Sequence, residues 1–160
     1  RVTEQALRYA AVTLKLDCPP TRVNRLLVAY LHLAPFPDVR DALAALSGRP
    51  LAILSNGNPM MLGAVVKNAG MEAAFAHVIS ADEAKIFKPA AKVYQLACDR
   101  LGLKKGEIGF VSSNCWDVCG AVAFGFSAWW VNRSGEAPDD LGVKAAPMLG
   151  SLAELPGSVR

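Results

Sequence analysis

Short polar side chains and one lysine follow three apolar runs of this sequence. Ser55-Asn56-Gly57 follows residues 51–54, Lys88-Pro89 comes shortly after residues 77–80, and a longer polar segment follows residues 108–111. That segment reads Ser112-Ser113-Asn114-Cys115-Trp116-Asp117. Hydroxyls, amides and an ammonium group favour an anion, as do the N-termini of helices that follow strands. If the three segments meet, they predict a site for a small anionic ligand.

The elements around these segments alternate between strand and helix, which predicts that the segments do meet. Strands are expected at 51–54, 77–80, 108–111 and 128–131, and the first of these is wholly apolar, as in a strand buried on both faces. Helices are expected at about 38–47, 58–70, 89–102 and 116–124, with a short last helix at 151–155. This order predicts an α/β fold in which helices cover both faces of a parallel sheet. Ligands bind such sheets at the carboxyl ends of the strands.

The first 34 residues have a different pattern. Residues 3–16 and about 21–33 repeat apolar residues at helical spacing, and Asp17-Cys18-Pro19-Pro20 separates them. We expect a helical hairpin whose second helix carries Val23, Leu26, Leu27 and Tyr30 on one face. Ala34-Pro35-Phe36-Pro37 then forms a stiff connector. The predicted boundary therefore lies near residue 35.

Composition narrows the class of protein. Apolar residues make up 52% of the 160 residues, and the net charge of +3 comes with no basic stripe, which argues against nucleic-acid binding. No apolar run is long enough to span a bilayer. The four cysteines, Cys18, Cys98, Cys115 and Cys119, form no CxxC motif, and neither histidine has metal-ligand spacing. We therefore expect buried thiols in a reducing cytoplasm.

Each polar segment also has a purely structural interpretation. Ser55-Asn56-Gly57 is equally typical of a capped turn, and Lys88 of a solvated lysine at a helix start. Ser112-Ser113-Asn114 is as typical of a helix cap, and Asp117 is favourable in any first helical turn. Trp116 taken singly indicates core packing. The functional prediction therefore depends on all of them sharing one edge of the sheet.

The same segments resemble the motifs of the haloacid-dehalogenase superfamily, in the form found in L-2-haloacid dehalogenases (haloacid dehalogenase type II). Residues 51–57 resemble the second motif, Lys88-Pro89 the third, and residues 110–117 the fourth. The string Ser-Ser-Asn-x-Trp-Asp is the specific one. The resemblance implies a Rossmann-like core of the haloacid-dehalogenase type over residues 35–160. It also implies that residues 1–34 are the remnant of a helical cap.

The family's chemistry implies a role for each of these side chains. An aspartate displaces the halide from a small 2-haloalkanoic acid, and water hydrolyses the resulting ester to a D-2-hydroxy acid. The resemblance implies that Lys88 keeps the nucleophile ionised, that Ser112 and Asn114 orient it, and that Asp117 acts on the hydrolytic water. It implies that Ser55 binds the substrate carboxylate and Asn56 the halide. Two aromatic residues complete the set, with Tyr94 in support and Trp116 as an apolar wall.

The nucleophile itself is not found in this sequence. The family's first motif, a strand ending in Asp-x-(Tyr or Phe)-Gly-Thr, has no counterpart, and the arginine of the family's early cap also has none. The resemblance therefore implies an N-terminally truncated enzyme whose core lacks its first, central strand. Such a strand's neighbours would expose unpaired backbone groups. We expect the 160-residue chain, made alone, to be poorly stable or to aggregate, and to hydrolyse no haloacid.

Two alternatives remain open. The first is an Mg-dependent phosphatase of the same superfamily, whose fourth motif usually carries two acidic residues four apart. Ser113 stands in the first of those positions here, so we expect no metal and no cofactor. The second is a non-catalytic remnant that binds a small carboxylate or a protein. The resemblance also implies a homodimer as the assembly, with no nucleic acid or membrane partner.

Overall fold

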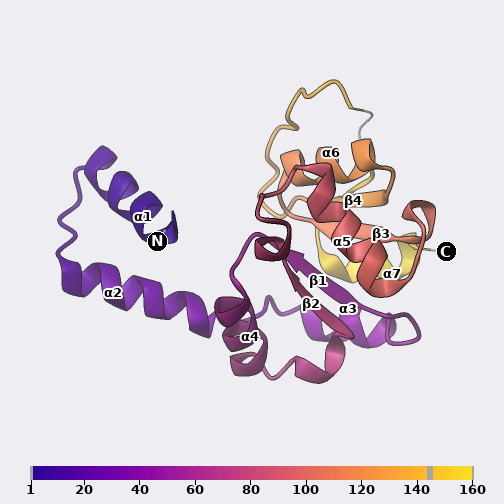
Figure 1. Cartoon of the computed structure of the whole chain (residues 1–160), viewed down its shortest axis with the longest axis horizontal. Helices are drawn as coiled ribbons and strands as arrows, with labels where there is room; N and C mark the ends of the chain where they lie inside the picture. Colours follow the sequence, from indigo (N-terminus) through magenta and orange to yellow (C-terminus); the bar gives the residue numbers. More distant parts are fainter. Residues whose placement is uncertain (1, 144–145, 160) are drawn as a thin grey trace.

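Five short strands form two parallel sheets in the computed structural model, which describes residues 2–143 and 146–159 (Figure 1). Strand β1 (Ala52–Ser55) pairs with β2 (His77–Ser80). Strand β3 (Gly109–Ser112) pairs with β4 (Ser127–Val131), and β4 pairs with the two-residue β5 (Met148–Leu149), which the sequence did not predict. All three pairings are parallel. The predicted α/β class is therefore confirmed.

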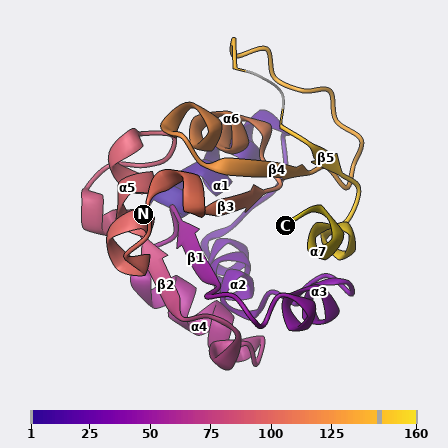
Figure 2. The same cartoon turned by 90° about the vertical axis from the view of Figure 1, so that its right-hand side faces the viewer.

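Helices surround these strands, as Figure 2 shows. They are α3 (Val39–Ala45), α4 (Pro59–Asn68), α5 (Ala91–Leu101), α6 (Cys115–Phe124) and α7 (Leu155–Ser158). Their ends follow the predicted signals: Asn58 Oδ1 accepts the Met61 N–H at 2.9 Å, and Gly102 and Gly125 have positive φ at the ends of α5 and α6. Helix α5 begins later than expected, because Pro89 precedes its first turn instead of opening it. The last helix, expected at 151–155, is a 3-10 turn at Leu152–Glu154 followed by α7.

The first two helices project away from the strands (Figure 1). Helix α1 (Val2–Thr13) ends three residues before the predicted end, since Lys15 takes a left-handed φ of 53°. Helix α2 (Pro20–Ala29) continues as a 3-10 turn at Tyr30–His32. On the apolar face predicted for this helix, Val23 is buried and Leu27 half-buried, whereas Leu26 and Tyr30 are exposed. None of the described helices is long and apolar enough to cross a membrane.

The two sheets do not join, and a cleft of about 610 Å³ lies between them. Ile53 of β1 and the pair Phe110 and Val111 of β3 line the cleft, together with apolar side chains from α3, α5 and α7. The expectation that β1 is buried on both faces was wrong, since all four of its residues are half-buried. The parallel strands therefore leave apolar surface and unpaired backbone where β1 and β3 face each other.

A polar cluster fastens the connector before α3 to the end of β4. Asp38 Oδ2 lies 2.9 Å from the Arg133 guanidinium and accepts hydrogen bonds from Ser151 Oγ and Leu152 N. These contacts, with the Arg133 hydrogen bond first, lower the pKa of Asp38 from 3.8 to about 2. The Arg133 guanidinium also lies 4.3 Å from the centre of the Phe36 ring. This cluster holds together segments that are more than one hundred residues apart in the sequence.

Candidate active site

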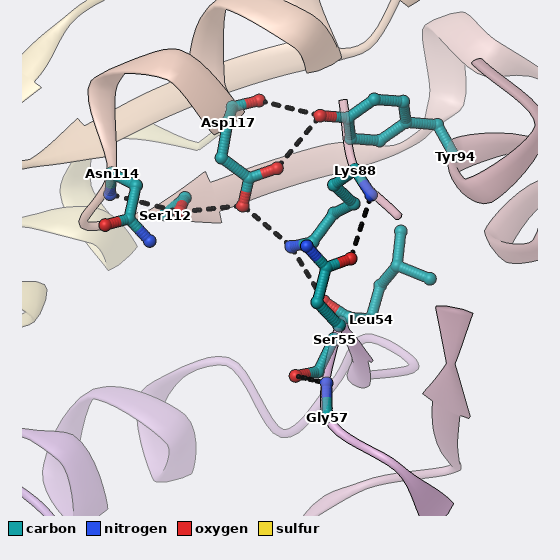
Figure 3. A network of polar contacts seen from close by, with 9 residues as sticks. Leu54, Ser55, Gly57, Lys88, Tyr94, Ser112, Asn114 and Asp117 are labelled. Atoms are coloured by element: carbon teal, nitrogen blue, oxygen red, sulfur yellow. Dashed lines mark hydrogen bonds and ion pairs between the residues drawn. The ribbon is translucent and has the colours of Figure 1, made fainter. Parts of the chain in front are cut away.

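The predicted lysine and carboxylate meet in a buried ion pair (Figure 3). Lys88 Nζ lies 2.7 Å from Asp117 Oδ2, and the two side chains are 9% and 3% exposed. Lys88 Nζ also donates to the Leu54 carbonyl at 3.0 Å. Lys88 therefore connects the carboxyl end of β1 to the first turn of α6. An ammonium group has three donors, so one N–H of Lys88 remains for a ligand.

Tyr94, on helix α5, makes hydrogen-bond contact with Asp117. It is fully buried on α5, and its hydroxyl donates to Asp117 Oδ1 at 2.9 Å and approaches the Asp117 carbonyl at 3.1 Å. Burial first, and then the negative charge of Asp117, raise the pKa of Tyr94 far above its usual value. The phenol therefore stays protonated and remains a donor. The resemblance implied a supporting residue, and the structure places Tyr94 against Asp117.

Ser112 joins the same carboxylate, whereas Asn114 stays free. Ser112 Oγ donates to Asp117 Oδ2 at 2.9 Å and accepts the Asn114 N–H at 3.2 Å. Asn114 occupies the N-cap position of α6, but within the described chain its side chain makes no capping hydrogen bond. The cap interpretation of this segment therefore fails for the Asn114 side chain, whose amide is exposed at the edge of the site.

The loop after β1 has a fixed conformation beside Lys88. Ser55 Oγ accepts the Gly57 N–H at 3.1 Å, and Asn56 Oδ1 accepts the backbone N–H of Lys88 at 2.8 Å. A backbone N–H can only donate, so the oxygen of the Asn56 amide must face it. The NH₂ group of Asn56 therefore points the other way, as a donor for a ligand. The Ser55 hydroxyl likewise keeps its proton for a ligand, because its oxygen is the acceptor for Gly57.

Trp116 lies on α6 beside a second, apolar hollow. This pocket has a volume of about 330 Å³, and Pro89, Cys119, Gly120 and Leu141 line it with Trp116. Trp116 is 37% exposed, so its indole is available to a ligand instead of being packed in the core. Core packing, the alternative for this residue, is therefore not what the structure shows.

Three contributors to the site were not predicted from the sequence. Ser80 is 2% exposed and donates through Oγ to the Gly57 carbonyl at 2.7 Å, so it holds the loop after β1. Its register opposite Ser55 at the end of β2 was the available signal. The Leu54 carbonyl carried no signal, because every residue has one. Gly120 gave none either, although a Cβ there would lie 2.5 Å from Tyr94 Oη and 2.7 Å from Pro89 Cβ.

Together, the carboxyl ends of the strands present the carboxylate of Asp117, the ammonium group of Lys88 with one spare N–H, and three uncharged donors. These donors are the Ser55 hydroxyl and the amides of Asn56 and Asn114. A carboxylate has about four lone-pair positions, and Lys88, Ser112 and Tyr94 use three of those on Asp117. The arrangement can bind an anion, keep a neighbouring carboxylate charged, and accept one further hydrogen bond from water.

Comparisons with known proteins identify the relatives of this chain. A sequence family described as haloacid dehalogenase-like hydrolases matches residues 2–125. The haloacetate dehalogenase H-2 of Moraxella sp. (strain B) is 48% identical over 142 residues, which are 88% of this chain and 63% of that protein. The (S)-2-haloacid dehalogenase of Pseudomonas putida is 42% identical over 157 residues, which are 97% of this chain and 69% of that enzyme.

Solved structures of the same superfamily are also similar to this chain. The L-2-haloacid dehalogenase of Xanthobacter autotrophicus matches with a TM-score of 0.87 at 37% identity, over 98% of this chain and 73% of that one. A phosphatase of the same superfamily from Thermococcus onnurineus matches with a TM-score of 0.73 at 28% identity, over 94% of this chain and 69% of that one. The chain spans slightly less than two thirds of two of the curated relatives, at 63% and 62% of their lengths.

Proposed function

We propose, from the premise that this chain belongs to the haloacid dehalogenase-like hydrolases, that the whole protein converts L-2-haloacids to D-2-hydroxy acids through an aspartyl ester. The observation that carries the proposal is the buried Lys88–Asp117 pair, with the Asn56 amide bonded to the Lys88 backbone at the same edge of the sheet. Relatives named haloacetate dehalogenase and (S)-2-haloacid dehalogenase support the substrate class. Residues 1–34 would then belong to the helical cap and residues 35–160 to the core.

The nucleophilic aspartate would lie on a further parallel strand between β1 and β3. The cleft there is lined by apolar side chains, as a buried central strand requires, and the facing edges of β1 and β3 are unpaired with each other. A strand in this position would end beside Lys88, whose ammonium group donates to the carbonyl of Leu54, the last apolar residue of β1. The spare N–H of Lys88 would hold the attacking carboxylate in its ionised form.

The substrate would bind through its two anionic parts. Its carboxylate would accept hydrogen bonds from the Ser55 hydroxyl and neighbouring backbone amides, and the departing halide would meet the NH₂ group of Asn56. Charge develops on the halide only as the carbon–halogen bond breaks, so a fixed donor there stabilises the transition state more than the substrate. Trp116 would supply the apolar wall beside the carbon chain.

Hydrolysis of the ester would use the carboxylate of Asp117. Its remaining lone pair would accept a proton from the attacking water, while Ser112 keeps Asp117 in place and the free amide of Asn114 holds the esterified side chain. Asp117 is held by Lys88, Ser112 and Tyr94, so its orientation is fixed before the water arrives. The ester would break at its carbonyl carbon, the proton taken by Asp117 would pass to the departing oxygen, and the hydroxy acid would leave with the configuration that the first, in-line step inverted.

The test is the activity of the whole protein on a set of substrates. (S)-2-Chloropropionate is expected to release chloride at a rate that EDTA does not change, and the (R) enantiomer is expected to release far less. Mg-dependent release of p-nitrophenol from p-nitrophenyl phosphate, without chloride release, would favour the phosphatase alternative, which the Thermococcus onnurineus neighbour keeps open. Stabilisation by 2-haloacids without turnover would favour the non-catalytic alternative.

Two less specific inferences accompany this proposal. The four cysteines are free, which supports a reducing cytoplasm as the location of the whole protein. We also propose a homodimer, which light scattering of the whole protein tests. A monomer at all concentrations would contradict that inference and leave the proposed reaction unaffected.

A further inference from the structure

Helix α6 carries two thiols one turn apart, outside the polar cluster of the active site. Cys115 and Cys119 are both half-buried, against the expectation of fully buried thiols, which only Cys98 meets. Residues four apart on a helix lie on one face with Cβ atoms about 5–6 Å apart. A single atom with two bonds to sulfur therefore has both sulfurs within reach. Among the described cysteines, no other two are this close in the sequence.

The protein around the two thiols fixes the position of Cys115 and partly buries Cys119. Cys115 Sγ accepts the backbone N–H of Asp139 at 3.3 Å, so the segment that follows β4 fixes its position. Burial, followed by the neighbouring Cys115 thiol, raises the pKa of Cys119. A hard cation needs oxygen ligands, and a tetrahedral zinc site needs four ligands, so two thiols suit neither. Two such thiols suit a compound whose central atom loses one oxygen as water and gains two bonds to sulfur.

An apolar space lies directly beside one of the thiols. Cys119 lines the pocket of about 330 Å³ together with Trp116, Phe124 and Leu141. This pocket is mostly apolar, so it would favour an aromatic substituent on a ligand bound to the sulfur. The location next to Trp116 also couples the pocket to the first turn of α6, where Asp117 lies.

We propose that Cys115 and Cys119 form a dithiol site for trivalent organoarsenicals, with the organic group in the pocket beside Trp116. The arsenoxide group, R–As=O, reacts with both thiols. Two S–H bonds break and two As–S bonds form, and the oxygen leaves as water with the two thiol protons. Arsenic stays trivalent, so no oxidant or reductant takes part. The two thiols take no part in the proposed reaction, although the pocket shares Trp116 with the proposed substrate site.

Phenylarsine oxide is the probe that tests this inference on the whole protein. One equivalent is expected to bind, to change the fluorescence of Trp116, and to be removed by excess dithiothreitol. Cys115→Ser and Cys119→Ser each leave one thiol and are expected to weaken binding about 100-fold or more, because the second bond is no longer intramolecular. Cys18→Ser and Cys98→Ser are the matched controls and are expected to bind like the parent chain.

Two further measurements keep the result interpretable. Far-UV circular dichroism compares the folding of every variant, and Cys115→Ala and Cys119→Ala replace the serine variants if a buried hydroxyl unfolds the chain. Trp116→Phe is expected to bind one equivalent but to lose the fluorescence change. Unaltered binding by both single variants of the pair would overturn the proposal. A fluorescence change that persists in Trp116→Phe would overturn the placement of the organic group.

Discussion

Lys88 and Asp117, which are 29 residues apart in the sequence, form the least exposed ion pair of the described structure, with Nζ and Oδ2 2.7 Å apart. Both partners make further hydrogen bonds, to Leu54 O on one side and to Ser112 and Tyr94 on the other. A buried ion pair contributes little net stability, but removal of one partner leaves an uncompensated buried charge. The pair is therefore the point at which a substitution should affect stability and chemistry together.

Lys88→Met is expected to lower the free energy of unfolding by about 3–5 kcal/mol, because Asp117 is then buried without a counter-charge. Lys85→Met is the matched control, since Lys85 and Asp82 form a pair at 2.9 Å whose side chains are 76% and 58% exposed. That exposed pair is expected to contribute about 1 kcal/mol or less. Urea unfolding of the whole protein with each substitution measures the two costs. Equal costs would contradict the burial argument.

Tyr94→Phe is expected to destabilise the chain by about 1–3 kcal/mol, since the buried Oδ1 of Asp117 loses its donor. The ring itself is retained, so its contacts with Phe110 and Phe126 persist. Tyr9→Phe, at a tyrosine that is 74% exposed, is the control and is expected to change little. Thermal unfolding followed by circular dichroism compares them. A Tyr94→Phe variant as stable as the parent would mean that water replaces the hydroxyl.

Gly120→Ala is expected to destabilise the chain by about 1–3 kcal/mol, because the new methyl group would overlap the Tyr94 hydroxyl and the Pro89 ring. Gly63→Ala is the control within another helix, where nothing lies within 4 Å of the added Cβ. That change is expected to stabilise by about 0.5–1 kcal/mol, since alanine favours helix. The opposite signs make denaturant midpoints a sharp measurement, and destabilisation by both would count against the close contact of α6 with Tyr94.

Asp38→Asn is expected to change how the free energy of unfolding depends on pH. The folded pKa of Asp38, about 2, lies below its ordinary value of 3.8, so the ionised group stabilises the fold above pH 4. This contribution is lost as the pH falls from about 4 to 2. The variant is expected to be less stable at neutral pH and to lose less between pH 4 and 2. Asp41→Asn, at an exposed position of α3, is the control and is expected to keep the parent slope.

The convergence of Lys88, Ser112 and Asp117 was predictable because parallel strands end at one edge of a sheet. The helix ends were predictable too, since Asn58, Gly102 and Gly125 act locally. Long-range packing was not. The half-exposure of β1 depends on what lies beside it, and the exposed face of α2 depends on what covers it. Neither the contact of Gly120 with Tyr94 nor that of Asp38 with Arg133 has any local signal.

Asn56→Asp separates the two functions of that amide in the whole protein. An aspartate oxygen is still able to accept the Lys88 N–H, but the donor proposed to face the halide is lost. We expect the loop to keep its conformation and kcat to fall about 100-fold or more, the range for loss of one fixed donor. Asn68→Asp, on α4 and away from this edge, is the control. Unchanged chloride release by Asn56→Asp would contradict the assignment of the halide to Asn56.

The most direct test of the central claim is chiral analysis of the hydroxy acid that the whole protein forms from (S)-2-chloropropionate, with and without Lys88→Met. The account predicts the inverted, D-configured lactate from the parent protein. It also predicts chloride release at least about 100-fold slower from the variant, because the attacking carboxylate loses its cation. Lactate of retained configuration, or an undiminished rate in Lys88→Met, would contradict it.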